Sequence, residues 1–339
     1  MRSLLALPKT DLHVHFQGSA RAETVRELAA RNEVPLPSSL AAGRYAFTDF
    51  GDFLLQYSFV CASLQTPDDV RRVAVEICED EAASGVRYAE VTLTIQGYGD
   101  RGDAIVAAVL DGFAEGESRT GLRARLVIDV VRGFPLDLAR PTVDTAIGFA
   151  GEGVVALGLG GDERHPPEPY EHLFREAIDA GLKSVPHAGE AAGPASIRGA
   201  LDVLGADRLG HGFRVLEDPE LVAEVRERRI PLECCPTSNV KTGIVSTFAE
   251  HPFRDLIDAG LWVTLNSDDP AMFEVSLLDE YESARALGFD DADLAAIARN
   301  GVQAAFLEAS AQETLIDEIA DWLAETPDTT PDPLQESSR

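Results

Sequence analysis

Short apolar runs alternate with amphipathic stretches along most of the chain. The apolar runs cover residues 12–15, 87–94, 124–131, 154–159, 183–187, 208–211, 230–234 and 262–266. Runs of this length, rich in Val, Ile and Leu, are typical of strands buried in a parallel sheet. A regular alternation of such strands with helices predicts a sheet covered by helices, and eight units of this kind predict a (β/α)8 barrel.

The predicted helices lie between these strands and after the last one. They cover residues 19–31, 50–57, 66–83, 102–118, 140–150, 168–180, 195–204, 217–227, 250–259, 274–287, 291–308 and 311–324. Ser19 is the expected cap of the first helix, and residues 33–46 are an expected loop. We therefore expect one α/β domain over residues 1–324, a TIM barrel with additional helices. Residues 325–339 are rich in Pro, Thr, Asp and Ser, which predicts a disordered acidic tail.

An open, doubly wound sheet is the alternative architecture. That fold usually carries a Gly-x-Gly-x-x-Gly segment after an early strand, and this sequence has none there. Polar residues instead follow at least five of the predicted strands, and a barrel gathers its strand ends at one rim. The pattern therefore favours the barrel.

Composition excludes several classes of protein. The formal net charge of −29 argues against a nucleic-acid partner, because affinity for phosphates depends on Lys and Arg. No apolar run is long enough for a membrane span, and the one before residue 12 is too short for a signal peptide. The four cysteines lack zinc-finger spacing, and the adjacent Cys234 and Cys235 cannot form an ordinary disulfide. These features favour a reducing cytoplasm and leave the oligomeric state open.

Histidines at the predicted strand ends indicate a metal site. His13 and His15 alternate on the first strand and so point to the same face. His187 ends the fifth strand and Asp268 follows the eighth, so a barrel rim would bring all four side chains together. Three imidazoles and one carboxylate suit one zinc ion per chain, with iron or manganese as alternatives. Such a site can lower the pKa of water from about 15.7 to about 7, which makes hydroxide the expected nucleophile.

Further polar residues at the same rim are candidates for acid–base chemistry. His211, between two glycines, could orient or deprotonate the water, or could simply be packed inside the barrel. Glu190 could give a proton to a ring nitrogen, or could be a solvated loop carboxylate. Asp269 is free for a substrate or caps the next helix. Glu233 is expected to support His211, with a structural ion pair as the alternative.

Two further features predict a pocket for a flat, partly apolar ligand. Gly160 and Gly161 end the fourth strand, where the missing side chains would let a ring lie against a backbone N–H. The aromatic residues of the helix at 50–57 recur at three- and four-residue spacing, which suits a ligand-facing surface and ordinary core packing equally well.

Six segments together carry a resemblance to a known family. They are Pro8-Lys-Thr-Asp-Leu-His-Val-His15, Gly161-Asp-Glu163, His187-Ala-Gly-Glu190, Gly210-His-Gly212, Glu233-x-Cys-Pro-x-Ser-Asn239 and Asn266-Ser-Asp-Asp-Pro270. In this order they resemble an adenosine deaminase of the metal-dependent amidohydrolase type, over about residues 8–310.

The resemblance implies a reaction and a set of site residues. It implies that a zinc ion is held by His13, His15, His187 and Asp268, and that the catalytic residues are Glu190, which protonates purine N1, with His211 and Asp268, which handle the water. It implies substrate contacts from Asp269 to N7, from the Gly161 N–H to N3, and from an apolar lid over the ribose formed by Phe50, Phe53, Leu54 and Tyr57. The implied reaction is hydrolytic deamination of a 6-aminopurine nucleoside, adenosine or a 5′-modified adenosine, to an inosine-type product and ammonia.

Gln17 departs from the family pattern. Adenosine deaminases usually carry an aspartate at this position, which contacts the ribose 5′-hydroxyl, and the adenine-specific relatives carry glutamate. A neutral amide can still hydrogen-bond a hydroxyl, but it does not repel anionic or bulky 5′ substituents. Aminodeoxyfutalosine, methylthioadenosine and free adenine are therefore alternative substrates. Arg132, at the end of the third strand, could meet such a substituent or could lie on the surface.

Two other classes of protein remain as alternatives. A barrel hydrolase acting on phosphotriesters or lactams typically uses a second metal bridged by a modified lysine, and no predicted strand ends in Lys. A catalytically silent binding protein on the same fold would be expected to lack Glu190 or a metal ligand, and all of these are present.

Overall fold

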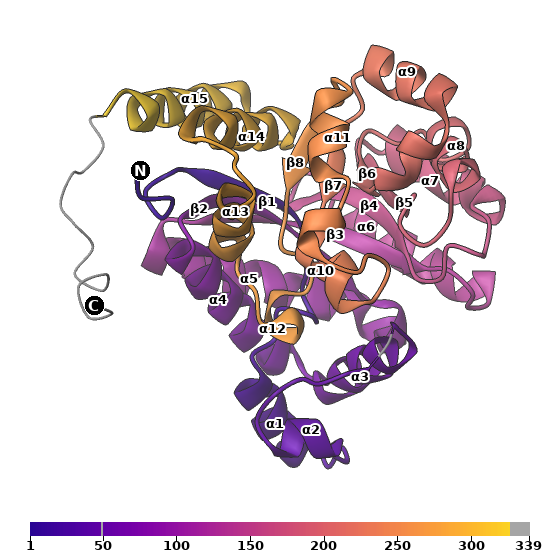
Figure 1. Cartoon of the computed structure of the whole chain (residues 1–339). Coiled ribbons are helices and arrows are strands. Elements are labelled where there is room, and N and C mark those ends of the chain that lie inside the picture. Colours follow the sequence, from indigo (N-terminus) through magenta and orange to yellow (C-terminus); the bar gives the residue numbers. More distant parts are fainter. Residues whose placement is uncertain (49, 326–339) are drawn as a thin grey trace, which may run out of the picture.

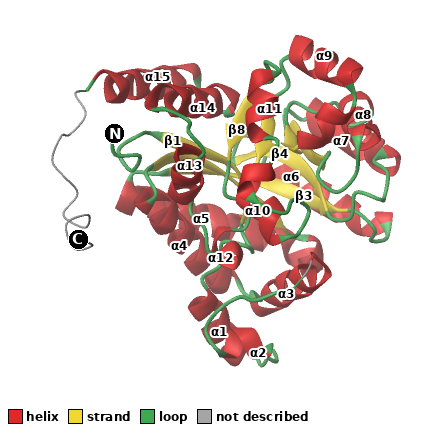
Figure 2. Ribbon diagram, in the orientation of Figure 1, coloured by secondary structure: helices red, strands yellow, loops and turns green. Residues whose placement is uncertain are grey.

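A computed structural model describes residues 1–48 and 50–325 of the chain. Within this part the sheet has eight parallel strands that pair in sequence order (Figures 1 and 2). They are β1 (Lys9–His15), β2 (Val86–Thr94), β3 (Arg123–Val131), β4 (Val154–Gly160), β5 (Lys183–Ala188), β6 (Leu209–His211), β7 (Leu232–Cys234) and β8 (Val263–Leu265). A bridge between Val14 and Asp268 joins the end of β8 to β1 and nearly closes the barrel. The predicted (β/α)8 barrel is thus confirmed.

Helices surround this sheet and extend the chain beyond it. They are α1 (Ala22–Arg31), α2 (Ser38–Ala41), α3 (Phe50–Ser63), α4 (Pro67–Ala83), α5 (Gly102–Thr120), α6 (Ala139–Gly148), α7 (Glu171–Asp179), α8 (Pro194–Asp202), α9 (Pro219–Arg228), α10 (Pro236–Lys241), α11 (Phe253–Asp258), α12 (Pro270–Phe273), α13 (Leu277–Ala286), α14 (Asp291–Ala304) and α15 (Ala309–Ala324). In the part of the chain that the structure describes, no helix is long and apolar enough to cross a bilayer.

The structure corrects several predicted boundaries. Ser19 does not cap α1, because the helix begins at Ala22 and the Ser19 hydroxyl donates to the His15 carbonyl at 2.7 Å. The expected loop at 33–46 contains the single-turn helix α2, and the helix predicted to reach 308 ends at Ala304. The predicted tail, from residue 326 onward, lies outside the described residues and stays a prediction.

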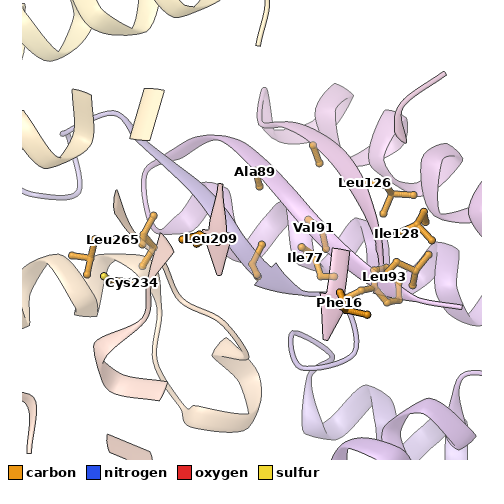
Figure 3. Close-up of a cluster of buried hydrophobic side chains, with 14 of the residues drawn as sticks. Phe16, Ile77, Ala89, Val91, Leu93, Leu126, Ile128, Leu209, Cys234 and Leu265 are labelled. Atoms are coloured by element: carbon orange, nitrogen blue, oxygen red, sulfur yellow. The ribbon is translucent and has the colours of Figure 1, made fainter. Parts of the chain in front are cut away.

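Alternate residues of the strands pack against the helices. Val91 and Leu93 of β2 and Leu126 and Ile128 of β3 are fully buried in this layer, beside Ile77 of α4 (Figure 3). Burial of such side chains stabilises a fold by about 1.5–3 kcal/mol each. This period-two pattern leaves the other set of strand residues pointing into the barrel, where the polar residues gather.

Charged residues fill the barrel near the N-terminal end of β6. We call Glu90, Arg208 and Glu233 the basal ion cluster. Arg208 is 1% exposed, its Nε donates to Glu233 Oε1 at 2.5 Å, and its Nη2 donates to Glu90. Its Nη1 donates to the Ala304 carbonyl at 2.9 Å, and the guanidinium lies over the Phe306 ring. The buried cation is therefore fully compensated by its neighbours.

Candidate active site

The four predicted metal ligands converge at the C-terminal ends of the strands. His15 Nε2 lies 3.2 Å from His187 Nε2 and 3.3 Å from Asp268 Oδ1, and His13 Nε2 lies 3.5 Å from the same oxygen. The backbone fixes this arrangement, because the His15 N–H donates to the Asp268 carbonyl at 2.7 Å and the Asp268 N–H donates to the His13 carbonyl at 2.9 Å. Strands at opposite ends of the chain thus bring the predicted ligands together.

The chemistry of these side chains fits a metal cation. Burial lowers the pKa of His15 to about 4 and that of His187 well below its usual value, so both imidazoles are neutral and carry a lone pair. Burial alone would raise the pKa of Asp268, but the neighbouring imidazoles of His13, His211 and His15 hold it well below its usual value. Two neutral nitrogens beside an ionised carboxylate form a set of electron-pair donors of the kind that zinc prefers.

Two other side chains lie within reach of the same point. His13, His187 and His211 each offer a ligand atom within 4.8 Å of the others, and His13, Asp268 and Cys235 form a second such group. Cys235 was not singled out from the sequence. Burial raises the pKa of its thiol well above the usual value, so it stays protonated and is a poor metal ligand.

Glu233 supports a different histidine from the one predicted. His13 Nδ1 donates to Glu233 Oε2 at 2.8 Å, whereas His211 Nδ1 lies 3.5 Å from the Asn239 amide. The bond to Glu233 leaves the lone pair of His13 on Nε2, which faces the other ligands. The basal ion cluster therefore continues through Glu233 to the candidate metal site.

His211 lies between two carboxyl groups. Its Nε2 is 3.7 Å from Glu190 Oε1 and 3.8 Å from Asp268 Oδ2. Burial lowers the pKa of His211 to about 3, so its imidazole is neutral. The lack of a side chain at Gly210 leaves room for the ring of His13, since a Cβ at residue 210 would lie 2.8 Å from His13 Cε1.

The backbone at two of the candidate residues is strained. His211 has a φ of 60° and Asp268 a φ of 65°, in the left-handed region that L-residues with side chains rarely adopt. Such conformations cost about 1–3 kcal/mol each and persist where contacts with the surrounding structure hold the backbone in place. Both residues carry candidate catalytic side chains, which is where stored strain is commonly found.

Glu190 is buried in the barrel rim and is not the solvated loop carboxylate considered above. Its Oε1 accepts from Asn239 Nδ2 at 3.0 Å. Burial, followed by the charge of Asp268, raises the pKa of Glu190 well above its usual value, which favours the protonated carboxyl group. This acid lies beside His211 at the candidate site, where it can transfer a proton to a ligand.

Glu163 organises the loop that presents Glu190. Its two carboxylate oxygens accept from the backbone N–H groups of Gly189, Glu190 and Ala192, at 2.7, 3.0 and 2.6 Å, and from the Ser196 hydroxyl at 2.9 Å. Glu163 belongs to a sequence motif, but this role was not predicted. Asn239 also lies in a motif without a predicted role, and its Oδ1 accepts from His251 Nε2 at 3.1 Å.

Asp269 does not cap the following helix. It occupies the residue before α12, but its side chain makes no capping hydrogen bond. The carboxyl group is buried against Gly18, and its Oδ1 has no hydrogen-bond partner among the described residues. Burial and the charge of Asp268 raise the pKa of Asp269 well above its usual value, so it can act as a hydrogen-bond donor.

Gly161 follows β4 directly and adopts a φ of 86°. A Cβ at this position would lie 3.3 Å from the backbone N and O of Arg132. Arg132 is itself buried, and so it is not the surface residue considered above. Its guanidinium donates to the His187 carbonyl and, at 3.3 Å, to the His165 carbonyl, which supports the end of β5.

The predicted lid residues on α3 differ in their surroundings. Tyr57 lies beside the site, with its ring centroid 6.3 Å from that of His15. Phe53 is buried and stacks on Phe273 of α12 at 5.2 Å, whereas Leu54 is 39% exposed. Figure 1 shows α3 beside α1 and α2 at one end of the molecule, close to α12. The side chain of Phe50 lies outside the described residues.

Gln17 is buried and uses its amide within the protein. Its Nε2 donates to the Thr94 carbonyl at 2.8 Å, and its Oε1 accepts from the Thr94 N–H at 3.3 Å and from the Tyr57 hydroxyl at 3.2 Å. Both lone pairs of the amide oxygen are occupied, which leaves one N–H for a ligand. Gln17 thereby connects the end of β2 to α3.

The fold and this site together define the chain as a barrel amidohydrolase. The adenosine deaminase family model matches residues 8–322, and the chain belongs to this family. The resemblance read from the six motifs is thus confirmed. The protein is an adenosine deaminase-type hydrolase that acts on carbon–nitrogen bonds of cyclic amidines, a metal-dependent family.

Relatives cover nearly the whole chain. The aminodeoxyfutalosine deaminase of Streptomyces coelicolor is 43% identical over 95% of this chain and 87% of its own length. The crystal structure of adenine deaminase from Arthrobacter aurescens has a TM-score of 0.88 and 32% identity, covering 94% of this chain and 99% of its own. An amidohydrolase from Burkholderia ambifaria, solved with bound Zn, has a TM-score of 0.86 and 30% identity, covering 95% and 94%.

Proposed function

We propose that the chain is a zinc-dependent deaminase that hydrolyses the 6-amino group of a purine nucleoside, with a 5′-substituted adenosine as its substrate. The observation that carries this proposal is the arrangement of His13, His15, His187 and Asp268, with the buried Glu190 beside them. The four free cysteines support a reducing cytoplasm as the location.

The first four residues would hold the zinc ion. The presence of bound Zn in the related amidohydrolase supports this metal. When bound, zinc supplies a lowered pKa for water, from about 15.7 to about 7, and so provides a nucleophile at neutral pH. Glu233 keeps the His13 ring in the orientation that this requires.

The remaining residues would move protons and orient the purine. Glu190 donates its proton to N1 as C6 is attacked, and His211, 3.8 Å from Asp268, accepts the proton of the attacking water. Asp269, protonated because it is buried beside Asp268, donates to N7. The Gly161 N–H donates to N3, so that N1, N3 and N7, the ring nitrogens not bonded to the sugar, each have a partner.

The surroundings of Gln17 favour a substituted 5′ position. Its amide oxygen is already occupied by Thr94 and Tyr57, so it has no free acceptor for a 5′-hydroxyl. The remaining N–H can donate to a 5′-hydroxyl oxygen and equally to a carbonyl or carboxylate oxygen of a larger substituent. The 43% identity to an aminodeoxyfutalosine deaminase supports a substrate of this kind. Free adenine is the second candidate, supported by the similarity to an adenine deaminase structure.

A substrate panel tests this function. The zinc-loaded protein would be incubated with adenine, adenosine, methylthioadenosine and aminodeoxyfutalosine, while ultraviolet absorbance and ammonia release are followed. We expect the highest kcat/KM for a 5′-substituted nucleoside. A preference for free adenine would favour the second candidate, and inertness towards all four purines would overturn both.

A further inference from the structure

Asp129 is a buried carboxylate that the proposed mechanism does not use. It lies on β3 with 3% of its surface exposed. Its carboxyl group fills the space beside Gly158 and Gly160 of β4, where added Cβ atoms would lie 2.7 and 2.5 Å from its two oxygens. Its Oδ1 has no hydrogen-bond partner among the residues that the structure describes. A buried polar atom without a partner is costly, which points to a ligand that supplies one.

The protein itself offers little compensation for this carboxylate. Arg132, three residues further along the chain, directs its guanidinium to the carbonyls of His187 and His165 instead. Burial raises the pKa of Asp129 to about 7, although the charges of Arg132 and His13 and a backbone hydrogen bond from Gly160 oppose this shift. The glycines at 158 and 160 therefore make room for a carboxylate that the protein leaves only partly satisfied.

Asp129 lies at the level of the candidate active site. In a barrel, inward-facing residues of alternate strands lie in the same layer. Asp129 on β3 therefore shares a layer with His15 on β1 and His187 on β5. Thr94 is the pairing partner of Asp129 on β2, and both backbone polar groups of Thr94 are bonded to Gln17. Asp129 is thus close to Gln17, the residue that is expected to lie at the sugar.

The orientation of the bound purine indicates which part of the substrate would lie above Asp129. This step rests on the proposed function. N1 and the glycosidic N9 are at opposite sides of the ring system. With N1 at Glu190 after β5, N3 at Gly161 after β4 and N7 at Asp269 after β8, N9 is directed towards the arc from β1 to β3. The sugar would therefore lie over Gln17, Thr94 and Asp129.

We propose that Asp129 Oδ1 accepts a hydrogen bond from a 2′- or 3′-hydroxyl of the nucleoside sugar. Gln17 is unable to act as this acceptor, because both lone pairs of its amide oxygen are occupied. Asp129 would then be a specificity-determining residue, which selects purines that carry a hydroxylated sugar.

Two substitutions and two substrates test this proposal. Asp129→Leu keeps the approximate shape of the side chain but removes the acceptor, and Asp129→Asn keeps a neutral acceptor. We expect Asp129→Leu to lower kcat/KM for adenosine by about 10-fold or more, the usual effect of losing a hydrogen bond to a charged group. On 2′,3′-dideoxyadenosine the same variant should stay within about 2-fold of the parent, and Asp129→Asn should give an intermediate loss on adenosine only.

Glu81→Met is the matched control. Glu81 is also a buried carboxylate whose Oε2 has no partner among the described residues, but it lies on α4, outside the barrel. This variant should leave the ratio between the two substrates unchanged. Zinc content would be measured in every variant by elemental analysis.

Several outcomes would overturn the role of Asp129. These are an equal loss on both nucleosides, no loss on either, or loss of zinc from both Asp129 variants, which would show an effect through the metal site. If Asp129→Leu fails to fold, the ratio in Asp129→Asn decides. A parent enzyme inert on all purines would overturn the proposed function as well, whereas an active parent with an unchanged ratio would overturn only the role of Asp129.

Discussion

The basal ion cluster and the rim of the barrel both bury charged side chains, but they differ in how many of these side chains have hydrogen-bond partners within the protein. At the base, Arg208 donates to Glu90, to Glu233 and to a backbone carbonyl, so that the buried cation is surrounded by acceptors. At the rim, among the described residues, several buried polar atoms have no hydrogen-bond partner, including His13 Nε2, Asp129 Oδ1, His187 Nδ1 and Asp269 Oδ1.

This difference separates a structural role from a functional one. Buried polar groups in proteins are nearly always paired, so a group of unpaired atoms that face one another at the rim indicates a place where a ligand completes the set. The two regions meet at His13, whose Nδ1 is bonded to the cluster through Glu233 and whose Nε2 faces the rim. We therefore expect substitutions at the base to act mainly on stability and substitutions at the rim mainly on activity.

The largest expected effect is that of His187→Ala at the rim. Loss of one ligand should abolish stoichiometric zinc and lower activity by about four orders of magnitude or more, since the metal is worth several kcal/mol to the reaction. Circular dichroism should show a folded barrel. His172→Ala, which alters an exposed histidine on α7, is the control and should keep zinc and activity. Stoichiometric zinc in His187→Ala would remove His187 from the ligand set.

Glu190→Gln tests the proton donor at the rim. The amide keeps the size of the side chain and a contact to Asn239, but it has no acidic proton for N1. We expect kcat to fall by about 10²–10⁴-fold while zinc content and substrate affinity are retained. Steady-state kinetics and calorimetric titration with a substrate analogue separate these quantities. Turnover within a few-fold of the parent would mean that another group is the acid.

Arg208→Gln tests the base. This change leaves Glu90 and Glu233 buried without their cation, so the free energy of unfolding should fall by about 3–5 kcal/mol. Denaturant titration measures this loss. Arg198→Gln is the control, because Arg198 also pairs with two carboxylates, Asp218 and Glu224, but at the surface, where little change is expected. Equal stabilities of the two variants would contradict the assignment of the base as a structural element.

The smallest expected effect is a change of preference in Gln17→Asp. A carboxylate can accept from a 5′-hydroxyl, but it no longer donates to the Thr94 carbonyl. We expect the ratio of kcat/KM for adenosine over aminodeoxyfutalosine to rise by about 10-fold. Gln17→Met, a neutral change of similar size, controls for the lost hydrogen bonds. A ranking unaffected by the aspartate would mean that Gln17 does not contact the 5′ position.

The sequence predicted the barrel because its strands are continuous apolar runs, whose burial depends little on the details of packing. It also placed His13 and His15 on one face, since a strand alternates with a fixed period. It did not predict α10 and α12, which begin with a proline and are too short to show helical periodicity. At Ser19, the local signal for a helix cap was overridden by a bond to the His15 carbonyl.

The partners of the site residues were harder to predict than their positions. Glu233 was expected at His211 but bonds to His13, because the stagger between barrel strands decides which inward side chains face each other. The same limit applies to Asn239 and Asp129. Their contacts join residues far apart in the sequence, and no local spacing distinguishes them from ordinary polar residues of a strand or loop.

The bonds between β1 and Asp268 also bear on how the protein is made. His13 and His15 leave the ribosome long before Asp268, by roughly 10–50 s at synthesis rates of about 5–20 residues per second. During that interval β1 lacks its neighbour at the closing edge, and the carboxylate of the proposed ligand set does not yet exist. The nascent chain therefore carries two histidines on an open edge, and the proposed ligand set is complete only after the eighth strand has been synthesised.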